Sequence, residues 1–229
     1  RVTQADNVPY EKVLTNAEIK KLWRFPIEDV KSNKNTYRNY AIVVLLLDTK
    51  IRNAELLDLT LADIDWKHHE VTVRRGKGGK FRVVSCSPIT LSAIDMYLVH
   101  GDRPKDADVT APLFGTFSTH EFKTNSNTDE WHRGSSQWLS SLVERYVEKY
   151  TGRDGIRTHA LRHSGASLDL NNGMSLEQIQ SELGHSSIVT TQIYSGRLQP
   201  ERHRQSSKGV IRYRNKCAQD NINRLSQIS

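Results

Sequence analysis

Apolar residues recur at helical spacing over most of the chain, and they alternate with polar residues over one short region only. A period of three to four residues is typical of helices that bury one face. We expect a helix that begins at Thr15, helices over residues 36–48, 53–59, 88–98, 137–150, 158–171, 176–183 and 187–194, and a weaker one near 213–225.

The residues at the expected helix ends agree with this pattern. Thr15 and Glu18 have the spacing of a capping box, in which each side chain satisfies a backbone N–H of the first turn. Ser87 is a suitable cap, and Pro88 suits the first turn of the helix that follows. Two glycines stand where helices are expected to end, Gly173 and Gly184.

The alternating region lies between residues 70 and 85. Residues 70–74 and 81–85 alternate, and the glycine-rich segment 76–80 makes a turn between them, which predicts a β-hairpin or small sheet. Residues 101–134 are rich in loop-forming residues. The chain is therefore predicted to be a mainly helical α+β protein with a small antiparallel sheet and a C-terminal helical tail.

Three segments are expected along the chain. Residues 1–13 are polar and without periodicity, so they resemble a linker that follows an upstream module. Residues 14–195 form the main domain, and residues 196–229 form a basic tail. The longest apolar run, residues 41–47, predicts a buried helix and is far shorter than the roughly 20 residues that span a bilayer.

The net charge of +7 is concentrated near the C-terminus. From Ser195 onward the chain carries eight Lys and Arg residues against two acidic ones, a local charge of +6. This favours a polyanionic partner such as nucleic acid, although a solvated basic tail is the plainer interpretation. Two distant cysteines, Cys86 and Cys217, form no disulfide framework, which favours a reducing, cytoplasmic location.

Candidate chemistry is concentrated between residues 159 and 194. His159 and Arg162 are three residues apart and share a helix face. An arginine binds two phosphate oxygens at once, and a neutral histidine accepts a proton from a phenol. With His185 and Tyr194 close behind, the set suits attack on a phosphate by the tyrosine oxygen.

Plainer readings of these residues remain open. A lone tyrosine near a helix end usually packs in the core, and His159 with Arg162 also suits a helix with one buried and one solvated side chain. His159 and His163 have the i,i+4 spacing of metal ligands, and with His185 they suggest a zinc site, which would point to a metal hydrolase.

Two further positions lie upstream. Arg52 follows the most apolar helix, where burying the charge of an arginine is unfavourable in free energy unless the side chain binds an anion. Glu55, three residues later, is placed to orient it. The plain alternative is a surface ion pair between Arg52 and Glu55, which would contribute little to the stability of the fold. Lys77 lies at the predicted hairpin tip, in a segment that does not have the P-loop pattern.

These residues and the short sequence motifs around them resemble the catalytic domain of the tyrosine recombinase, or phage integrase, family. The motifs are Arg-x-x-Glu-Leu at 52–56, Leu-Arg-His-Ser at 161–164, Leu-Gly-His-Ser at 183–186 and Thr-Thr-Gln-Ile-Tyr at 190–194. The resemblance covers about residues 14–196, and it implies site-specific DNA recombination or integration through a 3′-phosphotyrosine intermediate.

The resemblance also assigns a role to each residue. Tyr194 would be the nucleophile, Arg52 and Arg162 would clamp the phosphate, and His185 would hydrogen bond to it. His159 would act as the acid–base partner and Lys77 as the general acid. Glu55 would support the arrangement from behind. Candidates for DNA contact are Lys80, Arg82, His163 and Arg197. No metal, ATP or other cofactor is required.

Double-stranded DNA with specific sites is the implied partner, and the family acts as a tetramer, in which the tail of one subunit docks on the next. Members also carry an upstream DNA-binding domain, and this sequence is expected to begin in the linker that follows that domain. Alternatives are a type IB topoisomerase and a non-catalytic DNA-binding regulator on the same fold. The DNA target and the host element, whether phage, transposon or chromosomal system, stay open.

Overall fold

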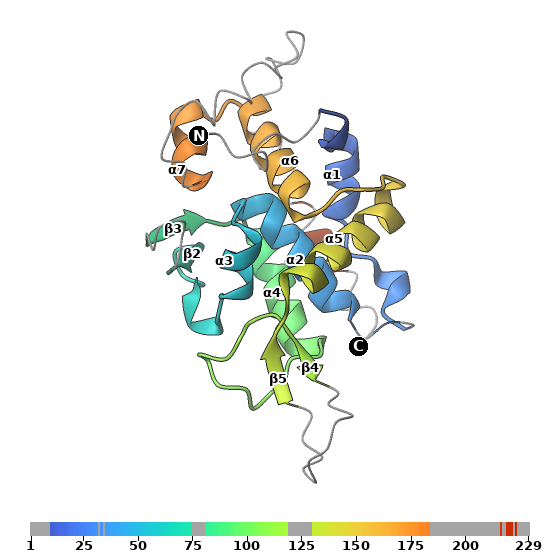
Figure 1. The fold of residues 1–229 in the computed structure, drawn as a ribbon, viewed down its shortest axis with the longest axis vertical. Helices are drawn as coiled ribbons and strands as arrows, with labels where there is room; N and C mark the ends of the chain where they lie inside the picture. The colour runs from blue at the N-terminus through green and yellow to red at the C-terminus, as the bar shows by residue number, and fades with distance from the viewer. Residues whose placement is uncertain are drawn as a thin grey trace.

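A computed structural model gives the fold of the chain (Figure 1). It describes residues 10–31, 33, 35–74, 81–118 and 130–183, and in the tail residues 216, 219–221 and 223. The helices are α1 (Asn16–Leu22), α2 (Thr36–Thr49), α3 (Asn53–Leu57), α4 (Pro88–His100), α5 (Ser136–Thr151), α6 (Thr158–Asn171) and α7 (Leu176–Leu183). The strands are β1 (Ile64–Asp65), β2 (Glu70–Val73), β3 (Arg82–Ser85), β4 (Gly115–Ser118) and β5 (Glu130–Arg133).

The apolar helix α2 lies at the centre of the molecule (Figure 1). It packs against α4, α5 and α6, and nearly every residue from Thr36 to Thr49 is buried. A helix that is apolar on all sides can be stable in water only when other elements cover it from several directions. The predicted buried helix at residues 41–47 is therefore confirmed.

Two predicted helix ends are confirmed, one is corrected, and Gly184 lies outside the described residues. Thr15 and Glu18 form the expected capping box, and Gly173 follows α6 with a positive φ of 90°. Ser87 precedes α4, but its side chain makes no cap. Its backbone N–H and hydroxyl instead meet the Asp48 carboxylate, at 2.5 and 2.8 Å. A buried carboxylate is the stronger acceptor, so it takes the Ser87 hydroxyl.

The predicted hairpin exists as part of a three-stranded antiparallel sheet in the order β1–β2–β3. Val71 pairs with Val84, and both are buried, whereas Val83 points outward and is 45% exposed. Residues 75–80, which include the predicted tip, lie outside the described residues. The sheet lies at one side of the molecule, beside α3 and near α7 (Figure 1).

A second sheet was not predicted. The strands β4 and β5 pair in an antiparallel sheet inside the stretch expected to be loop. Each strand has four residues, and Phe117 packs edge-on against Trp131 across the pair. Strands this short carry too few alternating positions to stand out in the sequence.

The described part of the tail lies against α1 and α2. Asn221 is 3% exposed, and its amide oxygen accepts the Phe25 N–H at 3.1 Å. Its amide nitrogen donates to the Trp23 carbonyl at 3.3 Å and to the Tyr40 hydroxyl at 2.8 Å. One asparagine thus ties the tail to the main domain of the same chain.

None of the helices that can be described in this chain is both long and apolar enough to pass through a membrane.

Candidate active site

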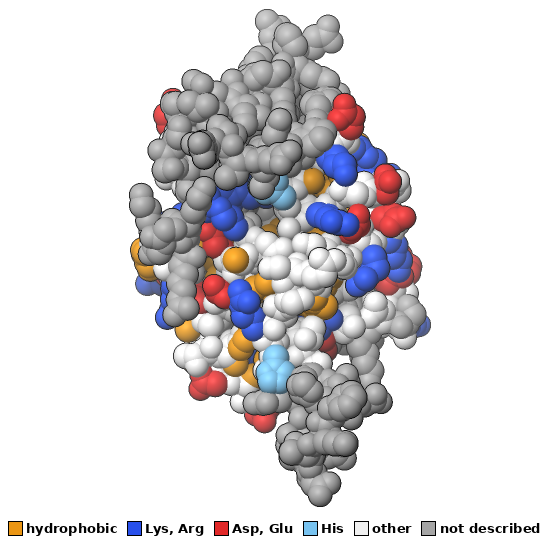
Figure 2. Space-filling view, in the orientation of Figure 1, with side chains coloured by type: hydrophobic (Ala, Val, Ile, Leu, Met, Phe, Trp, Pro, Cys, Tyr) orange, Lys and Arg blue, Asp and Glu red, His pale blue; other side chains and the backbone are white. Residues whose placement is uncertain are grey.

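The described candidate residues meet where α3, α6 and β3 approach the C-terminal end of α7. Arg52 and Glu55 lie at the start of α3, Arg82 lies on β3, and His159 and Arg162 lie on α6. These elements are far apart in the sequence, and Figure 1 shows them on one side of α2. Lys and Arg side chains are spread over the face drawn in Figure 2.

The Glu55 carboxylate holds two arginines. It accepts the Arg52 backbone N–H at 2.7 Å and the Arg52 Nη1 at 3.0 Å. It also accepts both ends of the Arg82 guanidinium, at 2.8 and 2.7 Å. The Glu55 side chain is only 3% exposed, so this is a buried cluster and not the surface ion pair of the plainer reading.

The surroundings of Glu55 keep it charged. Burial by itself would raise the pKa of this carboxyl, but the Arg82 hydrogen bonds and the Arg52 backbone N–H lower its pKa to about 2. The charged carboxylate in turn fixes where the two guanidinium groups lie. Of the two, Arg52 is the more open, with a side chain that is 27% exposed against 14% for Arg82.

Arg82 has a role that the sequence did not reveal. Besides Glu55, its Nε donates to the Glu182 carbonyl at the end of α7, at 3.2 Å. Its guanidinium therefore hydrogen bonds to two groups within the protein, and its contact with DNA stays a prediction. The only sequence signal was its place on a strand next to the glycine-rich turn.

Arg162 is buried between the ends of two helices. It is 3% exposed, and its Nη1 donates to the carbonyl of Lys50, just after α2. Its Nη2 donates to the Leu183 carbonyl, the last residue of α7, at 2.7 Å. Since a guanidinium has five N–H donors in one plane, two fixed donors set the orientation of the rest.

A glycine allows this close approach of α6 to α2. A Cβ on Gly165 would lie 2.2 Å from the Leu47 carbonyl oxygen, which is too close for any side chain. Gly165 therefore lets the two helices come together and brings Arg162 to the end of α2.

The two histidines of α6 contact each other. His159 Nε2 and His163 Nε2 are 3.2 Å apart, so one ring donates a proton and the other accepts it. His163 is 3% exposed and lies against His159, and its contact with DNA stays a prediction. The pair gives His159 a defined orientation on the face that also carries Arg162.

Several predicted site residues lie outside the described residues, namely Lys77, Lys80, His185, Tyr194 and Arg197. His185 follows Leu183 by two residues, so the end of α7 determines where the segment that carries it begins. Within the described ranges no three His, Cys, Asp or Glu side chains gather as metal ligands. The zinc alternative also includes His185, which is among the residues outside the described ranges.

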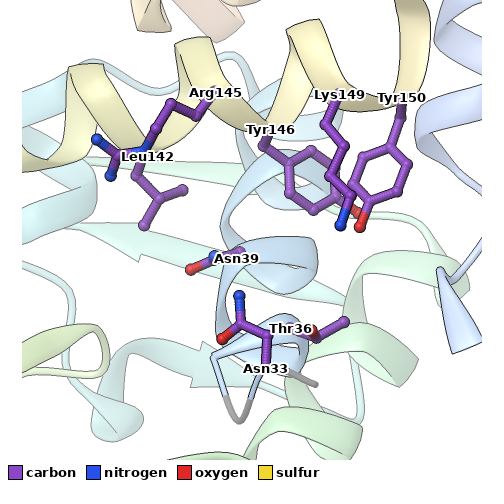
Figure 3. A pocket seen from close by; sticks show the side chains of 8 residues that line it. All are labelled: Asn33, Thr36, Asn39, Leu142, Arg145, Tyr146, Lys149 and Tyr150. Carbon is purple, nitrogen blue, oxygen red and sulfur yellow. The ribbon is translucent and has the colours of Figure 1, made fainter. Parts of the chain in front are cut away.

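A separate cavity of about 230 Å³ lies between α2 and α5 (Figure 3). Its lining contains none of the predicted site residues. Lys149 and Tyr150, which point into it, both bind Asp29, Lys149 at 2.8 Å. The cavity is thus remote from the arginine cluster in chemistry and in position.

Comparison with known proteins agrees with this geometry. The sequence profile described as "Phage integrase family" matches residues 12–199. Tyrosine recombinase XerA of Pyrococcus furiosus is 35% identical over 187 residues, which are 80% of this chain and 57% of XerA.

Solved structures share the fold. The crystal structure of XerA recombinase matches with a TM-score of 0.64 and 29% identity, over 90% of this chain and 64% of that one. The site-specific recombinase XerH, in a pre-cleavage complex with its difH substrate, matches with a TM-score of 0.61 and 24% identity, over 80% of this chain and 50% of that one. The chain therefore spans little more than half the length of the proteins it matches.

Proposed function

Because the chain belongs to the phage integrase family, we propose that it is the catalytic part of a site-specific tyrosine recombinase. It would cleave and rejoin DNA strands through a 3′-phosphotyrosine intermediate. The observation that carries this proposal is that Arg162 donates to the carbonyl of Lys50, two residues before Arg52, and that protein acceptors hold both arginines. Two oriented guanidinium groups are suited to a phosphate whose charge increases in the transition state.

The reaction consists of one exchange of bonds at phosphorus. The Tyr194 oxygen forms a bond to the scissile phosphorus as the bond to the 5′-oxygen of the next nucleotide breaks. His159 accepts the phenolic proton, and Lys77 supplies a proton to the leaving oxygen. Attack by a free 5′-hydroxyl on the phosphotyrosine reverses these steps, so the bond energy is conserved and ATP is not needed.

Positive charge on the arginines takes the place of a metal ion. Arg52 and Arg162 bind the non-bridging oxygens, and His185 adds a hydrogen bond to them. Glu55 supports Arg52 from behind, at 3.0 Å. A free tyrosine has a pKa near 10, and nearby cations favour the phenolate that attacks.

We also propose double-stranded DNA with specific sites as the partner, and a tetramer as the active assembly. The hydrogen bonds of the buried Asn221 to Trp23, Phe25 and Tyr40 support a docking role for the tail. The same three groups would receive Asn221 from a neighbouring subunit when the tail exchanges between copies.

Covalent capture of DNA tests the chemistry. A nicked duplex that carries a candidate site is incubated with the protein in EDTA, and the products are separated on a denaturing gel. We expect a covalent adduct that Tyr194→Phe removes while DNA binding is retained. Tyr150→Phe is the matched control, because its hydroxyl bonds to Asp29 beside the remote cavity, and it should still form the adduct.

Each other result has a definite meaning. An adduct that persists in Tyr194→Phe would reject Tyr194 as the nucleophile. An adduct that EDTA abolishes would favour the metal-dependent alternative. Absence of any adduct on DNA that the protein binds, with the upstream segment of a longer relative restored, would favour a binding-only regulator. Relaxation of one duplex without exchange between two would favour a topoisomerase.

A further inference from the structure

Lys50 has a backbone conformation that favours glycine. It directly follows α2 with φ 56° and ψ 22°, in the left-handed region that residues with a Cβ rarely adopt. The turn directs its carbonyl to Arg162, which donates to it. A glycine would make this turn with less strain, so the lysine side chain must serve some other purpose.

The Lys50 side chain lies inside the protein between two acidic groups. Lys50 is 2% exposed, and its ammonium contacts the Asp169 carboxylate of α6. It also lies 2.8 Å from Glu182 Oε2 of α7 and donates to the Asp48 carbonyl at 2.7 Å. We refer to Lys50, Asp169 and Glu182 as the anchor cluster.

The anchor cluster is stable only as a unit. Burial by itself would lower the pKa of Lys50, but Asp169, Glu182 and Asp48 raise it above its usual range, so the ammonium stays charged. A buried ion that loses its partner is strongly unfavourable. Without the ammonium, two carboxylates from α6 and α7 would face each other and repel.

The end of α7 that the anchor cluster holds also contacts the proposed site. The last carbonyls of a helix have no partner within the helix, and cations bind favourably there. Here Arg82 meets the Glu182 carbonyl at 3.2 Å, and Arg162 meets the Leu183 carbonyl at 2.7 Å. A shift of this turn would therefore move a hydrogen-bond partner of each arginine.

We propose that Lys50 is a positioning residue, whose buried ammonium holds the end of α7 against α2 and α6 and thereby orients Arg162. The catalytic consequence rests on the proposed function. The Lys50 ammonium does not touch the DNA phosphate in this scheme. It acts through the end of α7, whose Leu183 carbonyl accepts a hydrogen bond from Arg162.

The test compares Lys50→Gly with Glu182→Gln and the double variant. Glycine suits the left-handed turn, so Lys50→Gly removes the ammonium without adding backbone strain. Glu182 is 24% exposed at its side chain, so its replacement is the milder change if Lys50→Gly does not fold. Lys149→Met is the matched control, because it removes a lysine from an exposed ion pair with Asp29.

Three quantities are measured in the whole chain: hydrogen exchange of the α7 and α4 amides, the single-turnover rate of adduct formation at saturating DNA, and the Kd for that DNA. For Lys50→Gly we expect amide exchange in α7 to become about tenfold faster or more, because a buried ion pair is broken. The rate of adduct formation should fall by about tenfold or more. Exchange in α4 and the Kd should change little. The double variant should form the adduct no more slowly than Lys50→Gly, because both substitutions break the same ion pair.

A merely structural role would lower thermal stability without changing the cleavage rate of the folded protein. Unchanged α7 exchange in both single variants, or a wild-type cleavage rate despite faster α7 exchange, would overturn the proposal. If the wild-type protein, with the upstream segment of a longer relative restored, binds DNA but forms no adduct, the proposed function fails by itself. The α7 exchange then decides alone whether Lys50 holds this helix.

Discussion

At the scale of single residues, the site depends on charges that are buried and fully partnered. Glu55 accepts hydrogen bonds from two arginines that lie 30 positions apart, Arg52 and Arg82. Arg162 is held by two backbone carbonyls. Such groups lose little freedom when a ligand binds, because their orientation is set in advance.

The pKa of Glu55 makes a prediction about stability and pH. Its value of about 2 in the folded protein is below the usual glutamate value near 4.3, so the folded state favours the charged form. The stabilisation is complete above the unfolded pKa and is lost as the pH falls through about 2. We expect Glu55→Gln to unfold more easily at pH 7, by at most about 3 kcal/mol.

Denaturant unfolding of both proteins between pH 7 and pH 2 measures this difference, which should shrink below about pH 4.5. Glu144→Gln is the control, since Glu144 pairs with the exposed Arg157 at 2.9 Å and such a pair is worth less than about 1 kcal/mol. A Glu55→Gln difference that stays constant with pH would contradict the assigned pKa.

At the scale of elements, the proposed site is built from the ends of helices. The C-terminal ends of α2 and α7 supply carbonyl acceptors, and α6 lies between them and supplies Arg162. The distance between α2 and α6 is set by Gly165, where a side chain would strike the Leu47 carbonyl. Helix packing at this contact therefore controls the orientation of Arg162, for which we propose a catalytic role.

We expect Gly165→Ala to lower the free energy of unfolding by about 1–3 kcal/mol, as overpacked cores do, and to slow adduct formation. Thermal unfolding and single-turnover cleavage measure the two effects. Gly152→Ala is the control, because Gly152 has a positive φ of 76° but open space around it. It should cost stability through backbone strain alone and leave cleavage unchanged. Equal cleavage by both variants would show that the helix contact does not orient the site.

At the scale of the whole molecule, the tail connects to the main domain through Asn221. Its three hydrogen bonds to Trp23, Phe25 and Tyr40 lie at α1 and α2, away from the arginine cluster. Every copy carries these three partners, so a tail can in principle bind its own domain or that of a neighbour. Exchange of identical segments of this kind is a common route to oligomers.

Deletion of residues 206–229 tests this arrangement. We expect the shortened chain to bind a single DNA site and to form the covalent adduct, but to assemble two sites into a synaptic complex much less well. Native gels and light scattering with paired DNA sites measure the assembly. Asn221→Ala in the whole chain is a milder companion that removes the same contacts. Normal synapsis by both proteins would show that the tail is not the link between subunits.

The sequence predicted the elements where the local signal was strong. The apolar run of α2, the Thr15 capping box and the alternation around Val71 all follow from spacing between near neighbours. The strands β4 and β5 were missed because each is too short to show a period. Ser87 was assigned a cap, and the distant Asp48 took its hydroxyl instead.

The candidate site divides in the same way. Four of its residues were found because they lie in short sequence motifs with a regular spacing, namely Arg52, Glu55, His159 and Arg162. The supporting side chains were not found, since Lys50, Asp169 and Glu182 have no pattern that links them along the chain. Arg82 was noticed as a cation, but its binding to Glu55 depends on the packing of β3 beside α3.

The sequence by itself thus determined the helical class, the family resemblance and the residue types available for phosphate chemistry, because these depend on composition and on spacing over a few positions. Only the tertiary structure decided which of those groups are buried, which carbonyls hold Arg162 and which lysine neutralises α6 and α7. Those choices depend on contacts between segments that are distant in the sequence, such as Lys50 with Asp169, 119 residues apart. No local pattern encodes such a contact, since its strength comes from desolvation that exists only once the core has formed.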